Sequence, residues 1–309
     1  MNLEKEVVIL LATYNGEKYI SHQIDSILRQ THTNWKIIIH DDKSTDKTVD
    51  LLETYANKYP DKIQFVNDKI GFGNSLKNFS FLLDQADAEF IMFCDQDDVW
   101  HEDKIERSLV KMKEAQALEP GLPLLVHTDL CVVNAELEVL DESYVSYQHF
   151  DPSKNTLNRL LLQNVVTGCT VMINKELANL CLDMPEEAIA HDWWIALVAS
   201  CFGRIVYLDE PTMLYRQHAN NQVGAQDFNF KEIFTKARNL STISLNKYFT
   251  QANALRNRYR NELTVQELKL LDDFINIQGQ AWIRTKYTLV KHRFLKQGIQ
   301  RNIGLLFCK

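Results

Sequence analysis

The ten residues Val7–Gly16 read VVILLATYNG and predict the first step of the fold. The apolar, β-branched run favours a buried strand, and the Asn-Gly pair that ends it marks a turn. The stretch that follows, residues 17–30, favours a helix because its apolar residues recur every three or four positions. These residues are Tyr19, Ile20, Ile24, Ile27 and Leu28.

The same order of strand and helix recurs through the first 120 residues. Strands are expected at 35–39, 63–66 and 89–94, and helices at 46–59, 74–86 and 101–117. Short strands that alternate with helices predict a parallel sheet covered by helices on both faces. In such a sheet, ligands bind just beyond the carboxyl ends of the strands.

The rest of the chain shows a less regular pattern. Strands are expected at 123–127 and 205–208, a hairpin within 131–139, a strand at 165–173 interrupted at Gly168, and a helix at 188–202. Beyond about Gly224 only helical patterns remain. We therefore expect a catalytic α/β domain over residues 1–222 and a helical region over residues 223–309.

Composition excludes several classes of protein. The 309 residues are 45% hydrophobic and 24% charged, which is ordinary for a globular protein. The net charge of −7 argues against a nucleic-acid-binding protein. Six cysteines without a C-x-x-C pair argue for a reducing compartment and against structural zinc. Neither a signal peptide nor an apolar run long enough to cross a membrane is expected.

Three carboxylates lie within four residues directly after the strand expected at 89–94: Asp95, Asp97 and Asp98. Neighbouring carboxylates repel one another, and a divalent cation relieves that repulsion. Mg²⁺ commonly binds one or two carboxylates together with substrate phosphates. The cluster therefore indicates a metal and phosphate site, although Asp98 as the cap of the next helix is the alternative.

Acidic residues at two further element ends suggest other functions. Asp41 and Asp42 end the strand at 35–39, where an acid can accept hydrogen bonds from a ribose or a base, or can shape a turn. Asp192 begins an apolar helix and is a candidate general base or a simple cap. The adjacent Trp193 and Trp194 would raise its pKa and offer a flat surface to a sugar.

His218 is the last candidate, since it follows a strand-like run. A neutral imidazole nitrogen can bind a metal, although a lone histidine is more often structural.

Together these motifs resemble the inverting family-2 glycosyltransferases of the GT-A fold. The resemblance covers about residues 5–222. It rests on Val7–Asn15, Gln23–Thr31, His40–Asp46, Asp95–Asp98, Val166–Cys169, the residues around Asp192, and His218. It implies a Rossmann-like mixed sheet flanked by helices, a C-terminal helical extension, and a divalent metal, Mg²⁺ or Mn²⁺, as cofactor.

The resemblance also implies roles for single residues. The nucleotide sugar would contact Thr13, Tyr14, Asn15, Asp41, Asp42, Asp95, Asp97 and Gly168. The metal would be held by Asp97, Asp98 and His218. Asp192 would deprotonate the acceptor hydroxyl in a single inverting displacement, and Trp193 and Trp194 would line the sugar pocket. Two positions depart from the family pattern: Lys43 replaces a usual glycine, and His191 replaces a frequent acid.

Within the family, three motifs resemble bacterial rhamnosyltransferases of cell-wall and capsule polysaccharide synthesis: DQDDVW at 95–100, HDWW at 191–194 and YRQHANN at 215–221. This resemblance implies dTDP-β-L-rhamnose as donor and a saccharide acceptor carried on a polyprenyl lipid. A UDP-sugar donor and a catalytically inactive scaffold are the alternatives. A sugar-nucleotide pyrophosphorylase is disfavoured, because Thr13–Gly16 is not a Gly- and Arg-rich loop.

The last 29 residues, 281–309, carry seven Lys and Arg and no acid, so residues 1–280 carry a net charge of −14. Apolar residues are interspersed among these cations: Leu289, Val290, Phe294, Leu295, Ile299, Ile303, Leu305, Leu306 and Phe307. A basic amphipathic stretch suits an anionic membrane surface, so the protein is expected at the cytoplasmic face of the plasma membrane. Packing on the catalytic domain or in a homodimer is the alternative.

Overall fold

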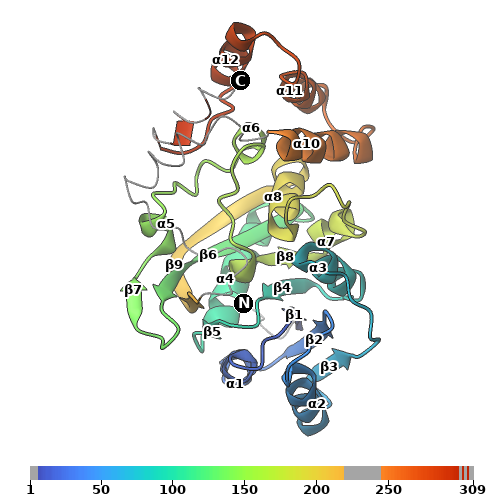
Figure 1. The fold of residues 1–309 in the computed structure, drawn as a ribbon, viewed down its shortest axis with the longest axis vertical. Coiled ribbons are helices and arrows are strands. Elements are labelled where there is room, and N and C mark those ends of the chain that lie inside the picture. Colours follow the sequence, from blue (N-terminus) through green and yellow to red (C-terminus); the bar gives the residue numbers. More distant parts are fainter. Residues whose placement is uncertain (1–5, 219–244, 299–300, 303–304, 306–309) are drawn as a thin grey trace.

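A computed structural model describes residues 6–218 and 245–298, together with Arg301, Asn302 and Leu305. The strands are β1 (Val7–Thr13), β2 (Trp35–Asp41), β3 (Ile63–Val66), β4 (Phe90–Cys94), β5 (Val99–Trp100), β6 (Leu124–Val133), β7 (Val139–Asp141), β8 (Met172–Asn174) and β9 (Arg204–Arg216). They form one sheet in the order β3-β2-β1-β4-β8-β6-β9-β5, with β7 paired to β6 (Figure 1).

Helices precede or follow most of these strands. They are α1 (Ile20–Leu28), α2 (Thr48–Lys58), α3 (Ser75–Asp84), α4 (Lys104–Leu118), α5 (Tyr144–Tyr147), α6 (Leu157–Leu160), α7 (Lys175–Cys181), α8 (His191–Phe202), α10 (Asn246–Arg258), α11 (Val265–Ile275) and α12 (Trp282–Lys291). A short 3₁₀ helix, η1, spans Gly168–Thr170.

The sheet is mixed, and this part of the expected fold is confirmed. β1 pairs in parallel with both β2 and β4, and β2 pairs in parallel with β3. β8 then lies antiparallel between β4 and β6, while β6 and β9 are parallel. The parallel half is built from the strand–helix alternation, and the antiparallel strands come from the less regular middle of the chain.

Both faces of the sheet are buried, which explains why β1 is apolar throughout. Val7, Ile9 and Leu11 face a core built with α1, α2 and α4. Val8 and Leu10 face the opposite core, built with α3, α7 and α8. Successive strand residues point to opposite faces, so a strand covered on both sides needs a continuous apolar run.

The C-terminal helices extend the second core. Phe249 and Leu255 of α10, and Leu271 and Phe274 of α11, belong to the same buried cluster as α8. Of the apolar tail residues, Leu289, Phe294 and Leu305 are buried in this cluster, Leu295 is half-buried, and Val290 is exposed. The boundary expected at residue 222 lies outside the described residues, as do Ile299, Ile303, Leu306 and Phe307.

One local expectation was wrong, and one alternative is excluded. The stretch 165–173 is not a strand: η1 occupies 168–170 and only Met172–Asn174 joins the sheet. Asp98 is not a helix cap, because β5 follows it and α4 begins at Lys104 with Asp103 as its N-cap. No helix within the described ranges combines the length and apolarity that a membrane crossing requires.

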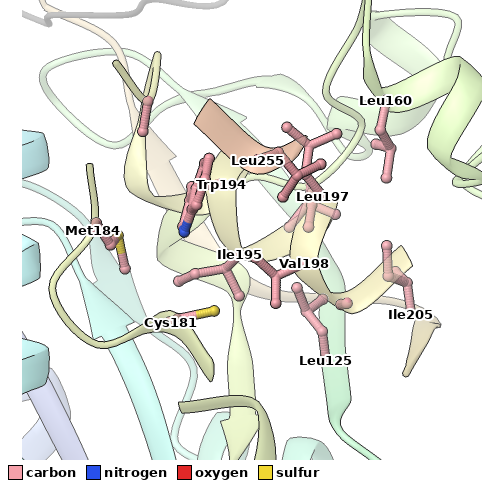
Figure 2. Packing of buried hydrophobic residues seen from close by; sticks show 14 of the residues in the cluster. Leu125, Leu160, Cys181, Met184, Trp194, Ile195, Leu197, Val198, Ile205 and Leu255 are labelled. Atoms are coloured by element: carbon pink, nitrogen blue, oxygen red, sulfur yellow. The ribbon is translucent and has the colours of Figure 1, made fainter. Parts of the chain in front are cut away.

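The assignment of Trp194 to a sugar pocket was also wrong. Its side chain is 0% exposed and packs in the core beside Leu197 and Leu255 (Figure 2). The apolar pattern of α8 explains this, because seven of its residues from His191 to Ala199 are buried and the helix has little free surface. Trp194 is therefore a residue of the hydrophobic core.

Replacing Trp194 tests this assignment. Trp194→Ala is expected to lower the free energy of unfolding by about 3–5 kcal/mol, because truncation of a buried aromatic leaves a cavity. Urea denaturation of the full chain measures the effect. Trp282→Ala, which truncates a half-exposed tryptophan on α12, is the matched control and should change stability by less than about 0.5 kcal/mol. Equal destabilisation by the two variants would contradict the assignment.

Candidate active site

The carboxyl ends of β1, β2 and β4 meet at one edge of the sheet. Thr13 at the end of β1 is in register with Asp41 at the end of β2. Leu11 is in register with Cys94, the last residue of β4. The polar segments that follow these strands, beginning at Tyr14, Asp42 and Asp95, are therefore brought together, as expected for a parallel sheet.

Asp41 holds the first two of these segments in place. Its carboxylate accepts hydrogen bonds from the Thr13 hydroxyl at 2.8 Å, the Ser44 hydroxyl at 2.6 Å and the Ser44 N–H at 2.7 Å. Asn15 adds a second link, since its side-chain oxygen accepts a hydrogen bond from the Thr45 N–H at 2.8 Å. Asp41 thus shapes the turn, and a direct contact between it and a nucleotide stays a prediction.

Gln96 links the β1 turn to the acidic cluster, and the sequence patterns did not identify it. Its side chain accepts a hydrogen bond from the Tyr14 N–H at 2.8 Å and donates one to the Tyr14 carbonyl at 2.9 Å. A side chain at Gly16 would collide with it, because a Cβ there would lie 2.4 Å from Oε1. The Tyr14 ring remains half exposed at the rim of the site.

Asp42 is turned towards the loop before α3. One of its oxygens accepts hydrogen bonds from the N–H groups of Phe72 and Gly73. The adjacent Lys43 has φ of 61°, in the left-handed region that glycine favours. This backbone conformation gives a physical reason for the glycine that the family usually has here.

Asp97 and His218 meet, although 121 residues separate them. Nε2 of His218 lies 2.8 Å from Oδ2 of Asp97. The histidine ring stacks on Tyr19 with centroids 4.8 Å apart, and the Arg216 guanidinium lies 4.5 Å from the centroid of the same Tyr19 ring. Arg216 also donates a hydrogen bond to the Asp97 carbonyl at 2.8 Å. Tyr19 and Arg216 therefore position the pair expected to hold the metal.

Asp98 is fully buried next to this pair. Its Oδ1 accepts a hydrogen bond from the Arg216 N–H at 3.1 Å. Burial raises the pKa of its carboxyl well above the usual range, and the charges of Asp97 and Asp95 raise it further. Burial, then the charges of Asp97 and Asp192, raise the pKa of Asp95 as well. Without a cation, these acids therefore retain protons that they would otherwise lose.

This donor set fits a divalent cation. Oxygen atoms of Asp95 and Asp98 and the sulfur of Cys169 all lie within 4.8 Å of one another, and Asp97 and His218 adjoin them. A cation would lower the raised carboxyl pKa values and replace the repulsion with attraction. Burial raises the pKa of the Cys169 thiol well above its usual range, so the thiol keeps its proton; the remaining oxygen and imidazole donors suit Mg²⁺ and Mn²⁺.

Asp192 lies beside this cluster at the start of α8. Burial raises the pKa of its carboxyl to about 6, although backbone N–H groups of Trp193 and Gly168 act in the opposite direction. The hydrogen bond from Trp193 N–H is 2.7 Å long. An acid with a pKa near 6 is ionised at neutral pH yet more basic than an ordinary aspartate, which suits a general base.

The neighbouring His191 is a structural residue of this site. Its ring packs on Phe79, with centroids 4.0 Å apart, and burial lowers its pKa to about 3, so it stays neutral. Trp193 is half-buried, and its indole N–H donates to the Leu160 carbonyl at 2.6 Å. The role of Trp193 in binding a sugar stays a prediction.

Gly168 allows close contact between η1 and α8. A Cβ at this position would lie 2.8 Å from Nε2 of His191 and 3.4 Å from Cβ of Asp192. Because the His191 ring is held by Phe79, Gly168→Ala is expected to shift Asp192. We expect about a 100-fold loss of activity, the usual consequence of a displacement near 1 Å. Steady-state kinetics measure this. Gly121→Ala is the control: no atom crowds that position, so activity should be kept, although the φ of 76° means that the added side chain lowers stability.

Known glycosyltransferases are similar to this chain in sequence. Residues 8–118 match the sequence profile of glycosyl transferase family 2. The dTDP-rhamnosyl transferase RfbG of Shigella flexneri is 31% identical over 299 residues, which cover 88% of this chain and 89% of that protein. The putative teichuronic acid biosynthesis glycosyltransferase TuaG of Bacillus subtilis is 28% identical, over 65% of this chain and 75% of that protein.

Solved structures share the fold. TarS 1–349 of S. aureus, in complex with UDP-GlcNAc, aligns with a TM-score of 0.55 at 18% identity, covering 90% of this chain and 82% of that one. The identity to RfbG extends over nearly the whole of both chains, beyond the segment that the family profile matches. The chain therefore belongs to glycosyl transferase family 2 and is a glycosyltransferase with the GT-A fold.

Proposed function

We propose that this glycosyltransferase transfers L-rhamnose from dTDP-β-L-rhamnose to a saccharide acceptor, with inversion at the anomeric carbon. The assignment of the donor rests on the 31% identity to the dTDP-rhamnosyl transferase RfbG over nearly the full length of both chains. The acidic cluster and the raised pKa of Asp192 support the mechanism, because they supply a cation site and a base side by side.

Asp192 acts as the general base in this mechanism. Its carboxylate takes the proton of the acceptor hydroxyl while the hydroxyl oxygen attacks C1 of the rhamnose. The bond between C1 and the diphosphate oxygen breaks in the same step, and dTDP leaves with the bonding electrons. The attack comes from the face opposite the leaving group, so a β-linked donor forms an α-linked product.

Asp97, Asp98 and His218 would hold the divalent metal, with Asp95 beside them. When bound, the metal neutralises the charge that develops on the leaving diphosphate. Thr13, Tyr14, Asn15 and Asp42 line the nucleotide pocket, where the exposed Tyr14 ring offers a flat surface to the base. Gly168 contacts the donor sugar through its backbone, since its lack of a side chain brings η1 directly against His191 and Asp192.

The acceptor is a saccharide on a polyprenyl diphosphate lipid, and the enzyme works at the inner face of the plasma membrane in surface polysaccharide synthesis. The relative TuaG, a putative glycosyltransferase of teichuronic acid biosynthesis, supports a role in such polymers. The basic C-terminal stretch supports the location, because the inner leaflet carries anionic lipids.

Donor hydrolysis and transfer, measured across a panel of nucleotide sugars with Mg²⁺, Mn²⁺ or chelator, test the proposal. We expect metal-dependent turnover of dTDP-rhamnose in preference to UDP-glucose, UDP-GlcNAc and GDP-mannose. Turnover of a UDP-sugar alone would contradict the assignment of dTDP-rhamnose as donor and would leave the proposed mechanism unchanged. Absence of turnover with every donor, when a lipid-linked acceptor is supplied, would indicate the inactive scaffold.

A further inference from the structure

We propose that the exposed side of α12 docks on an anionic lipid surface. This side, called the α12 face, consists of Trp282, Ile283, Lys286, Tyr287, Val290 and Lys291. The proposal deepens the proposed function, on which it rests for its purpose, since a lipid-linked acceptor lies in a membrane. Its evidence comes from the packing, exposure and charge of α12 itself.

Apolar side chains dominate the centre of the α12 face. Trp282, Ile283, Tyr287 and Val290 are 54%, 76%, 65% and 59% exposed. At about 100° per residue, these four and Lys286 occupy a continuous arc of roughly 140° of the helix surface, and Lys291 borders it. Single exposed apolar residues are common on proteins, whereas a contiguous group with a charged rim indicates a binding surface.

The opposite side of α12 is already packed. Thr288 and Leu289 are buried, and Leu289 belongs to the core cluster that contains Phe274 and Phe294. His292, just after the helix, pairs with Asp273 of α11 at 3.3 Å. The helix is thus held on the body of the protein, and the α12 face is the side that the core does not use. Figure 1 shows α12 at the end of the molecule away from α1 and α2.

Charge indicates an anionic partner. The C-terminal stretch 281–309 has seven Lys and Arg and no acid. On α12, Arg284 and Lys291 are exposed beside the apolar arc. Each Lys or Arg near an anionic membrane surface contributes about 1 kcal/mol to binding, so several of them together with an apolar face give measurable association.

Each of the two aromatic rings on this face has a lysine ammonium close to it. The Lys286 ammonium lies 5.6 Å from the Trp282 ring centroid, and the Lys291 ammonium lies 5.9 Å from the Tyr287 ring centroid. Trp and Tyr are enriched where hydrocarbon meets headgroups, and lysines there reach the lipid phosphates. The Tyr287–Lys291 pair suits that interface, whereas the half-buried Lys286 also donates a hydrogen bond from its ammonium to the Leu305 carbonyl at 3.1 Å.

A second copy of the chain fits this face less well. In a twofold dimer the same patch meets itself, so the cations Arg284, Lys286 and Lys291 of one copy would face a surface with the same positive charge. Such like-charge contacts cost binding energy and would select against the symmetric arrangement. A lipid surface presents the opposite charge instead.

Vesicle flotation of the full chain tests the proposal. The wild-type protein is expected to float with phosphatidylglycerol-containing vesicles at low salt, and not with phosphatidylcholine alone. Ile283→Ser/Val290→Ser should weaken this binding at least about tenfold, and Arg284→Glu/Lys291→Glu should do the same. The substituted side chains are exposed, so thermal unfolding should be unchanged in both variants.

Controls use residues of α11 that are equally exposed. Val265→Ser removes an apolar side chain that is 82% exposed, and Lys269→Glu reverses an exposed charge; both should bind vesicles as the wild type does. Equal binding by all variants, or no wild-type binding to anionic vesicles, would overturn the proposal. Concentration-dependent dimerisation that the Ile283→Ser/Val290→Ser variant abolishes would assign the face to a second copy and would also overturn it.

Donor hydrolysis in the absence of vesicles separates this proposal from the proposed function. The α12 variants should hydrolyse the donor at the wild-type rate, because α12 contributes no residue to the acidic cluster. Vesicle binding without any donor turnover would refute the proposed function and leave the docking surface intact.

Discussion

Asp192→Asn is expected to lower kcat for sugar transfer by up to about 10⁴-fold, the upper range for loss of a general base. The amide occupies the same space as the carboxyl but cannot accept the proton of the acceptor hydroxyl. Donor affinity should stay within about twofold, because the proposed donor pocket is built from the β1 and β2 turns and the acidic cluster. Kinetics with saturating donor, together with equilibrium binding of the donor, measure both quantities.

The pH dependence should identify the same group. The pKa of Asp192 is raised to about 6 by burial, so the carboxyl is protonated and inactive below that pH and ionised above it. The transfer rate should therefore rise through about pH 6 and level off towards pH 7, and this limb should disappear in the Asn variant. Asp61→Asn is the control and should keep both rate and profile, because this exposed acid lies just before β3, at the edge of the sheet opposite the site. Retention of a tenth of the activity by Asp192→Asn would rule out its role as the base.

The parallel half of the fold was predictable because its signals are local. Val7–Thr13 and Trp35–Asp41 are apolar, β-branched runs that end in turn residues, and both became central strands. Their shared direction places the following acids at one edge of the sheet. The grouping of Asp41, Asp42 and Asp95 to Asp98 therefore followed from periodicity alone.

The contacts that position these acids were not predictable in the same way. Gln96 hydrogen-bonds to Tyr14, 82 positions away, and no periodicity or spacing signals that bond. Tyr19 appeared only as an apolar residue of the helix expected at 17–30, yet its ring stacks on His218. Such contacts depend on the approach of segments that are distant in the chain. The only local signals were the position of Gln96 between two acids and the position of Tyr19 just after a turn.

Trp194 was, by contrast, assigned to the site although it does not belong there. An indole next to the proposed general base suggests a sugar-binding surface, but α8 is apolar on nearly every side. A helix of that kind is enclosed by its neighbours, so its tryptophan packs in the core. The apolar pattern of α8 in the sequence therefore predicted the environment of Trp194 better than the chemistry of its side chain did.

Asp97→Asn is expected to abolish most metal binding and to lower transfer by at least about 10³-fold, since a bound cation contributes several kcal/mol to stabilising the leaving diphosphate. The substitution removes the negative charge that faces His218 at 2.8 Å and keeps the shape of the side chain. Mn²⁺ binding, followed by electron paramagnetic resonance without donor, gives a readout that does not depend on activity.

His218→Asn should weaken Mn²⁺ binding as well, although less strongly, because imidazole is a neutral ligand. Asp61→Asn should bind Mn²⁺ as the wild type does, which separates loss of a ligand from loss of one surface charge. If Asp97→Asn binds Mn²⁺ as tightly as the wild type while Asp95→Asn does not, Asp97 is not the ligand, and the pairing of Asp97 with His218 is structural. A wild-type chain that binds no Mn²⁺ would contradict the metal site altogether, and the raised pKa values of Asp95 and Asp98 would then describe carboxyls that stay protonated.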